Sequence, residues 1–158
     1  MNHLLRSSAK SLLFLALGCL IDVHQSNAQP IAVGANVTIT LTTGVAGGTM
    51  TSVVNAARTI TYRRQVAISK ITVSTSCPGQ SFTLKVLATG VPDGIAAPEV
   101  DLVNGMPATD FIVSIPARPP NTARTCNLRY TASATFAQGN STEDGNDVHT
   151  VTYTILAQ

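Results

Sequence analysis

A histidine and an aspartate near the C-terminus are the first candidates for catalysis. His149 is the one histidine that follows residue 28, and Asp147 precedes it by two positions, so both side chains would share a face of an extended strand. A catalytic triad also needs a nucleophile that the histidine activates. No Gly-x-Ser-x-Gly elbow marks a serine for that role. We therefore expect a protein that is not an enzyme and has no catalytic residues, with a hydrolase built on His149 as an alternative.

An acidic loop, NSTEDGND at 140–147, is the one candidate metal site in the sequence. Carboxylate and amide oxygens are the ligands that calcium prefers, but their order does not match an EF-hand loop, and polar turns use the same residue types. Zinc is not expected, because too few histidines and free thiols remain. We predict no metal and no cofactor, with calcium as the alternative. Its ligands would come from Asn140, Glu143, Asp144, Asn146 and Asp147.

The first 28 residues are typical of a secretory signal peptide. Arg6 and Lys10 form a basic start, an apolar run covers 11–21, and small residues at 26–28 precede the expected cleavage point. The run is too short to cross a bilayer, which needs roughly 20 residues, and no later run is long enough. We expect a protein that is secreted, periplasmic or at the cell surface, has no transmembrane segment, and consists of a signal peptide (1–28) and a single β-sandwich domain (29–158).

Cys19 also raises the question of a lipid anchor. It ends the stretch ALGC, but Ala16 stands where a lipoprotein signal has a leucine or a branched residue. The sequence does not favour this anchor.

Two cysteines, Cys77 and Cys126, remain in the expected mature chain. Each falls on the apolar face of a strand pattern, and an isolated pair in an oxidising compartment is usually bonded. We predict a buried disulfide between them. Closing a loop of that length would stabilise the fold by about 4 kcal/mol in the chain-entropy model.

The elements that carry these residues alternate with period two almost throughout. The clearest stretch is 124–138, where even positions from Cys126 to Phe136 are apolar and odd positions are polar. A second pattern covers 71–77, turns at Pro78–Gly79 and resumes over 82–88, which predicts a hairpin. A strand over 59–69 with a bulge near Ser69–Lys70 is also expected.

Shorter patterns complete the expected sheet. A strand over 99–103 meets an Asn104–Gly105 turn before a strand over 111–115. Loops are predicted at 44–48, 89–98, 116–123 and 139–147. The pattern as a whole favours an all-β fold, an antiparallel immunoglobulin-like β-sandwich of about 7–9 strands with one disulfide. A strict immunoglobulin domain is less favoured, since the chain has no tryptophan and Arg124 stands where the corner tyrosine would be.

The charge of the chain bounds its partners. Residues 29–158 contain eight Arg and Lys and seven Asp and Glu, which gives a net charge of +1, and Arg63–Arg64 is the densest basic pair. Nucleic acid is not expected as a partner, because binding it requires clustered cations.

The mature chain would both open and close on an alternating strand. Ile31, Val33, Val37, Ile39 and Leu41 share a face at the N-terminal end, and Val151, Tyr153 and Ile155 share one at the C-terminal end. Gly145 is the fourteenth residue counted back from Gln158.

The two ends together resemble those of chaperone–usher fimbrial (pilin-like) subunits. The resemblance implies that the N-terminal strand completes the sandwich of the next subunit by β-strand addition, and that the final strand is read by a chaperone. Ala157 departs from the aromatic penultimate residue of that family, and the cysteines lie later than its usual disulfide.

The sequence as a whole predicts a structural or adhesive surface protein with a protein partner or self-assembly. The most specific form of this prediction is a subunit of a fimbria-like assembly. The alternative is an extracytoplasmic ligand-binding module that uses loops 89–98 and 139–147, with or without calcium.

Overall fold

The computed structural model describes residues 31–41, 51–117, 122–135 and 147–158, and the fold is traced over these ranges. The expected signal peptide, loop 44–48 and most of the acidic loop lie outside them. In the part of the chain that is described, no helix is long and apolar enough to cross a membrane.

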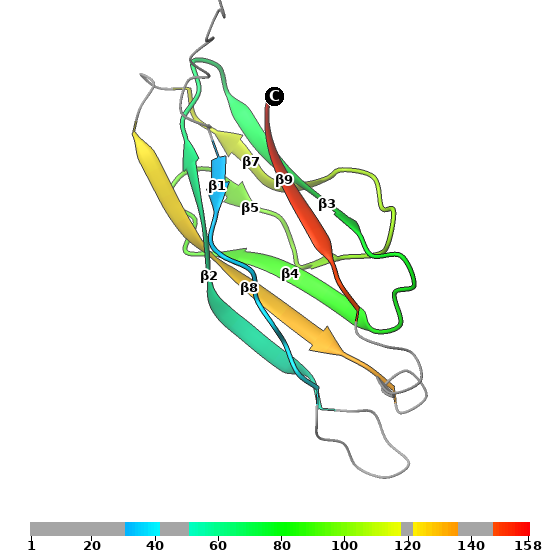
Figure 1. Ribbon diagram of the computed structural model, residues 1–158. Coiled ribbons are helices and arrows are strands. Elements are labelled where there is room, and N and C mark those ends of the chain that lie inside the picture. Colours follow the sequence, from blue (N-terminus) through cyan, green and yellow to red (C-terminus); the bar gives the residue numbers. More distant parts are fainter. Residues whose placement is uncertain (1–30, 42–50, 118–121, 136–146) are drawn as a thin grey trace, which may run out of the picture.

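Nine antiparallel strands form two sheets in the described ranges (Figure 1), which confirms the all-β prediction and its strand number. One sheet has the order β1-β2-β8-β4-β6 and the other the order β5-β7-β3-β9. The strands are β1 (Ile31–Val33), β2 (Val53–Arg63), β3 (Ser69–Ser76), β4 (Thr83–Thr89), β5 (Ile95–Ala96), β6 (Val100–Asp101), β7 (Thr109–Ile115), β8 (Ala123–Ser133) and β9 (Thr150–Ala157).

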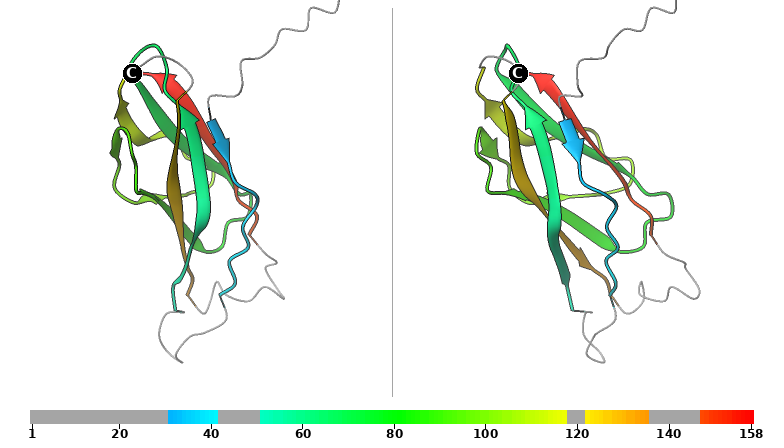
Figure 2. Two further views of the ribbon diagram at one scale, coloured as in Figure 1. Left: turned by 90° about the vertical axis from the view of Figure 1, so that its left-hand side faces the viewer. Right: turned by 60° about the vertical axis from the view of Figure 1, so that its left-hand side comes forward.

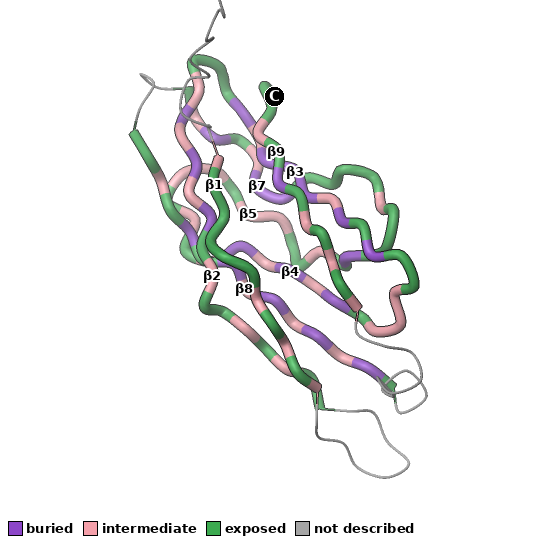
Figure 3. Tube along the Cα trace, in the orientation of Figure 1, coloured by how far each residue is buried: buried purple, intermediate pink, exposed green. Residues whose placement is uncertain are grey.

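The core lies between the two sheets and follows the alternation of the sequence (Figure 3). On β8, every even position from Cys126 to Ala132 is buried. The hydroxyls of Tyr130 on β8 and Tyr153 on β9 lie 2.9 Å apart in the interior, and the ring of Phe111 packs on Tyr153 with centroids 5.3 Å apart. Burying these two hydroxyls is tolerable because each is the other's hydrogen-bond partner.

The hairpin predicted over 71–88 is wrong, although both predicted turns exist. Gly79 and Gly105 adopt positive φ of 77° and 71° at the two turns. However, β3 and β4 join different sheets, and so do β6 and β7. The turns therefore carry the chain from one sheet to the other, because alternation specifies which face is buried but not which strand is the neighbour.

The expected strand over 59–69 is interrupted. β2 ends at Arg63, and Val66 and Ile68 are 81% and 52% exposed in the crossing to β3. The register between β3 and β7 shifts opposite Lys70, as predicted, but the extra residue is on β7, where Ser114 has φ of 56°. The bulge is stabilised by the C-terminal residue, whose side-chain Oε1 accepts a hydrogen bond from the Ser114 amide at 2.8 Å.

The predicted Cys77–Cys126 disulfide is absent, and both cysteines are free and buried. Tyr130 and Tyr153 mark a common level of the two sheets, and Tyr153 is opposite Val73 on β3. The strands β3 and β8 run in the same direction (Figure 1). Cys126 lies four residues before Tyr130 and Cys77 lies four residues beyond Val73, so the two cysteines lie toward opposite ends of the sandwich. At about 3.3 Å per strand residue, the thiols are on the order of 20 Å apart, too far to be bonded.

Candidate functional site

A groove of about 870 Å³ lies between β2 and β8 on one side and β9 on the other. Residues Val33–Leu41 form one wall of it, and Phe82, Leu84, Tyr130 and Tyr153 contribute apolar surface. The N-terminal segment runs between β2 and β9 in all three views (Figures 1 and 2). Both of the terminal segments that the sequence singled out therefore line this groove.

The segment 34–41 lines this groove without being a strand. Val37, Ile39 and Leu41 are half-buried and pack against the core, whereas Thr38 and Thr40 are exposed. The alternation predicted for this segment is thus confirmed at these positions. Val33 and Ala35, by contrast, are exposed.

Few backbone bonds hold this segment. Only Ile31–Val33 pair with β2 as a strand, and the Gly34 amide donates to the Thr59 carbonyl at 3.1 Å. Arg58 then donates from its guanidinium to the Asn36 carbonyl at 2.6 Å. Among the described residues, β9 pairs only with β3 and the Val53–Asn55 part of β2 pairs only with β8, so two strand edges face the segment.

The C-terminal strand β9 lies where the sequence predicted. Val151, Tyr153 and Ile155 point toward the core, and the strand pairs with β3 from Thr150 to Ala157. The Gln158 amide donates to the Ile68 carbonyl at 2.9 Å. The last residue of the chain is therefore docked in its own sheet.

A cluster of three side chains lies at one end of the groove, where β3 ends and β9 begins. The side chains of Cys77, Asp147 and His149 bring a sulfur, a carboxylate oxygen and a ring nitrogen to within 4.8 Å of one another. The register of β3 and β9 explains the meeting, because Ser76 is opposite Thr150. Sequence reasoning missed this cluster, because it assigned Cys77 to a disulfide.

His149 is held in the cluster by one nitrogen. Its Nδ1 lies 3.2 Å from the Thr75 hydroxyl, and its Nε2 is buried with no described hydrogen-bond partner. Burial lowers the pKa of His149, and the nearby Asp147 carboxylate opposes that shift. Cys77 is fully buried, and burial, with Asp147 adding to it, raises the pKa of the thiol.

Asp147 caps the start of the strand that follows the β3–β4 turn. Its carboxylate accepts hydrogen bonds from the Ser81 amide, the Ser81 hydroxyl and the Phe82 amide at 2.8 to 3.0 Å. The other residues proposed as calcium ligands, at 140–146, lie outside the described residues. Of that set, the structure therefore describes the contacts of Asp147 alone.

The same contacts do not form a serine triad. A triad places the histidine between the nucleophile and the acid. Here the Ser81 hydroxyl donates directly to Asp147, while His149 contacts Thr75. The contacts described for Asp147 and His149 therefore support structural or metal-binding roles.

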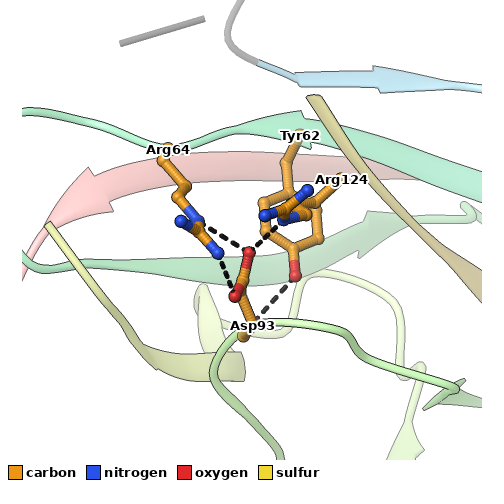
Figure 4. A network of polar contacts seen from close by, with 4 residues as sticks. All are labelled: Tyr62, Arg64, Asp93 and Arg124. Atoms are coloured by element: carbon orange, nitrogen blue, oxygen red, sulfur yellow. Dashed lines mark hydrogen bonds and ion pairs between the residues drawn. The ribbon is translucent and has the colours of Figure 1, made fainter. Parts of the chain in front are cut away.

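A polar network around Asp93 (Figure 4) fixes the segment 89–98, which was predicted as a loop but contains the short strand β5. The Asp93 carboxylate accepts hydrogen bonds from both Arg64 and Arg124, and the Tyr62 hydroxyl donates to the Asp93 carbonyl at 2.8 Å. Asp93 and Arg64 are 12% and 6% exposed. The two guanidiniums, Arg64 foremost, lower the pKa of Asp93, and burial raises the pKa of Tyr62 to about 12. The loop is thereby tied to β2 and β8.

Comparisons of the chain with protein-family models, with curated proteins and with solved structures found no match.

Proposed function

We propose that this protein is a structural or adhesive subunit of an extracytoplasmic assembly, in which residues 31–41 of one copy occupy the groove of the next. The observation that carries the proposal is the segment 34–41, which lines the groove and packs alternate side chains against the core yet is not paired as a strand. We also infer that the sandwich is immunoglobulin-like, on the support of its two antiparallel sheets of five and four strands.

The energetics of the segment favour exchange between copies. The contacts that Val37, Ile39 and Leu41 make in their own groove can be made equally in the groove of a neighbour, so exchange costs little in contact energy. The two strand edges beside the segment, which have no further partner strand among the described residues, can gain backbone hydrogen bonds from a well-aligned incoming strand. Residues 42–50, which join the segment to β2, include three glycines in their sequence.

A head-to-tail exchange of this kind can give open chains. Each copy would donate its segment to one neighbour and accept a segment from another, so the interface is heterologous and extends into an open chain when the rotation between copies does not close a ring. This geometry supports a fibre or a surface layer more than a closed dimer.

The gel behaviour of the protein tests this proposal. We expect the protein, recovered from its native host without denaturant, to give a ladder on an unboiled gel that collapses to one band after boiling. Ile39→Asp places a charge in the apolar groove and should abolish the ladder. Thr38→Asp carries the same charge one residue earlier, on the exposed side of the segment, and should give the same ladder as the parent protein.

A synthetic peptide of residues 31–42 separates loss of assembly from loss of folding. Added in excess to the parent protein during assembly, it should cap the acceptor grooves and shorten the ladder, whereas the same peptide with aspartate at position 39 should not. A single monomer band at every concentration, or an identical ladder from both aspartate variants, would refute the proposal.

A further inference from the structure

We propose that Cys77, Asp147 and His149 form a binding site for a zinc ion, independent of the assembly proposed above. The three side chains offer a thiolate, a carboxylate oxygen and an imidazole nitrogen within 4.8 Å of one another. Cysteine, histidine and aspartate are the residue types that bind zinc in proteins. The mixture of a soft thiolate with an imidazole selects zinc over calcium or magnesium.

The groups around the three ligands suit a metal site. His149 presents a buried Nε2 with no described partner, while its Nδ1 is oriented by the Thr75 hydroxyl. Metal-binding histidines are usually oriented in this way through the second ring nitrogen. Burial and the Asp147 carboxylate raise the pKa of the metal-free Cys77 thiol, and the Val148 amide opposes that shift.

The distances require only a small contraction. Zinc bonds of about 2.0–2.3 Å place tetrahedral ligand atoms roughly 3–4 Å apart, so the three atoms would move together by about 1 Å at most. Asp147 keeps a carboxylate lone pair for the metal, since its described bonds are two to Oδ2 and one to Oδ1. Three protein ligands leave a fourth position for water or for an added ligand.

The metal reading accounts for the cluster better than a cysteine nucleophile does. Cys77 is fully buried, so its sulfur cannot meet a substrate in bulk solution. A zinc ion is much smaller than a substrate and does not require an exposed sulfur. Its charge deprotonates a coordinating thiol, and the proton leaves to the solvent.

Cobalt substitution is the direct test, because a thiolate bound to Co²⁺ gives a sulfur-to-metal charge-transfer band in the near ultraviolet. Purified under reducing conditions and freed of metal, the protein should bind one Co²⁺ per chain with this band, and Zn²⁺ should displace it. Zinc should also raise the melting temperature of the protein.

Two cysteine variants provide the matched comparison. Cys77→Ser should remove the charge-transfer band and weaken zinc binding by more than 100-fold, beyond the roughly 10–100-fold typical of groups that only orient a ligand. Cys126→Ser changes an equally buried thiol at the other end of the sandwich and should leave both unchanged. His149→Gln should weaken zinc binding while keeping the sulfur band at high cobalt concentration.

The apo forms of all three variants are compared by circular dichroism and melting, so that a folding defect is not taken for a lost ligand. Absence of the band in the parent protein, or an unchanged zinc affinity in Cys77→Ser or His149→Gln, would overturn the assignment.

Discussion

Asp93 shows how a single carboxylate can position a whole loop. It is the shared acceptor of Arg64 on one side and Arg124 on the other, and its own carbonyl receives the Tyr62 hydroxyl (Figure 4). Removing one member of a buried ion pair leaves the other charge without compensation, which is more costly than losing an exposed pair. The loop 89–98 is thus held by charge, and we infer that its first role is structural.

We expect Asp93→Asn to lower the free energy of unfolding by about 3 kcal/mol at pH 7, because Arg64 is left buried and unpaired. Asp110→Asn breaks the exposed pair with Lys70 and should cost less than about 1 kcal/mol. Urea unfolding of both variants beside the parent measures the difference. Equal losses would show that the network at Asp93 is not buried in solution.

The same residue gives a pH dependence of known sign. The folded pKa of Asp93 is lowered, so its contribution to stability is fully present above the unfolded value of about 3.9 and is lost as the pH falls through the folded pKa. The gap in unfolding free energy between parent and Asp93→Asn should therefore be constant from pH 5 to 7 and shrink below about pH 4. A gap that shrinks instead on raising the pH would contradict the assignment.

At the scale of elements, the loop before β5 packs directly against the backbone of β7, which its sequence does not indicate. Gly94 has φ of 95°, and a Cβ there would lie 2.7 Å from the Val113 carbonyl oxygen and 3.1 Å from Ile112. Gly105 also has positive φ, but a Cβ there would meet nothing within 4 Å. Only the close approach of Gly94 to β7 distinguishes these two glycines, each of which follows an Asp or Asn in the sequence.

This difference predicts two alanine variants of unequal effect. Gly105→Ala carries the strain of positive φ alone, about 1–2 kcal/mol, whereas Gly94→Ala adds a clash with backbone and should cost about 3–5 kcal/mol. Thermal and urea unfolding of the pair give the comparison. If the two losses match, the loop does not lie against β7 as described.

At the scale of the whole molecule, the described residues form a sandwich without a disulfide, since Cys77 and Cys126 are both unbonded. Cys126 lies between the sheets, where burial raises the pKa of its thiol to about 11, and Cys77 lies at the far end of β3. Both therefore remain thiols that oxidants in solution reach poorly.

Reductant should consequently leave stability unchanged. We expect the melting temperature of the metal-free protein to be the same with and without reductant, and Cys77 and Cys126 to be alkylated in denaturant without prior reduction. A fall in stability on reduction, near the about 4 kcal/mol of the chain-entropy model, would instead show a bond between them.

Within most strands the sequence by itself determined which side chains are buried, because alternation is a local property, although Val33, Val66 and Ile68 are exposed. The even positions of β8, the inward face of β9 and the half-buried Val37, Ile39 and Leu41 all follow from it. The turns at Gly79 and Gly105 also follow, because they depend on a few neighbouring residues.

Only the tertiary structure decided which strands are neighbours. Alternation does not record whether a turn continues in one sheet or crosses to the other, so a hairpin was predicted at Pro78–Gly79, where the chain crosses to the other sheet. Nor does it record the level of a residue along the sandwich, and so the two cysteines were paired although they lie at opposite ends. That same level brings Cys77 beside Asp147 and His149, which are seventy or more residues away in the chain, because long-range register is fixed by the packing of whole sheets.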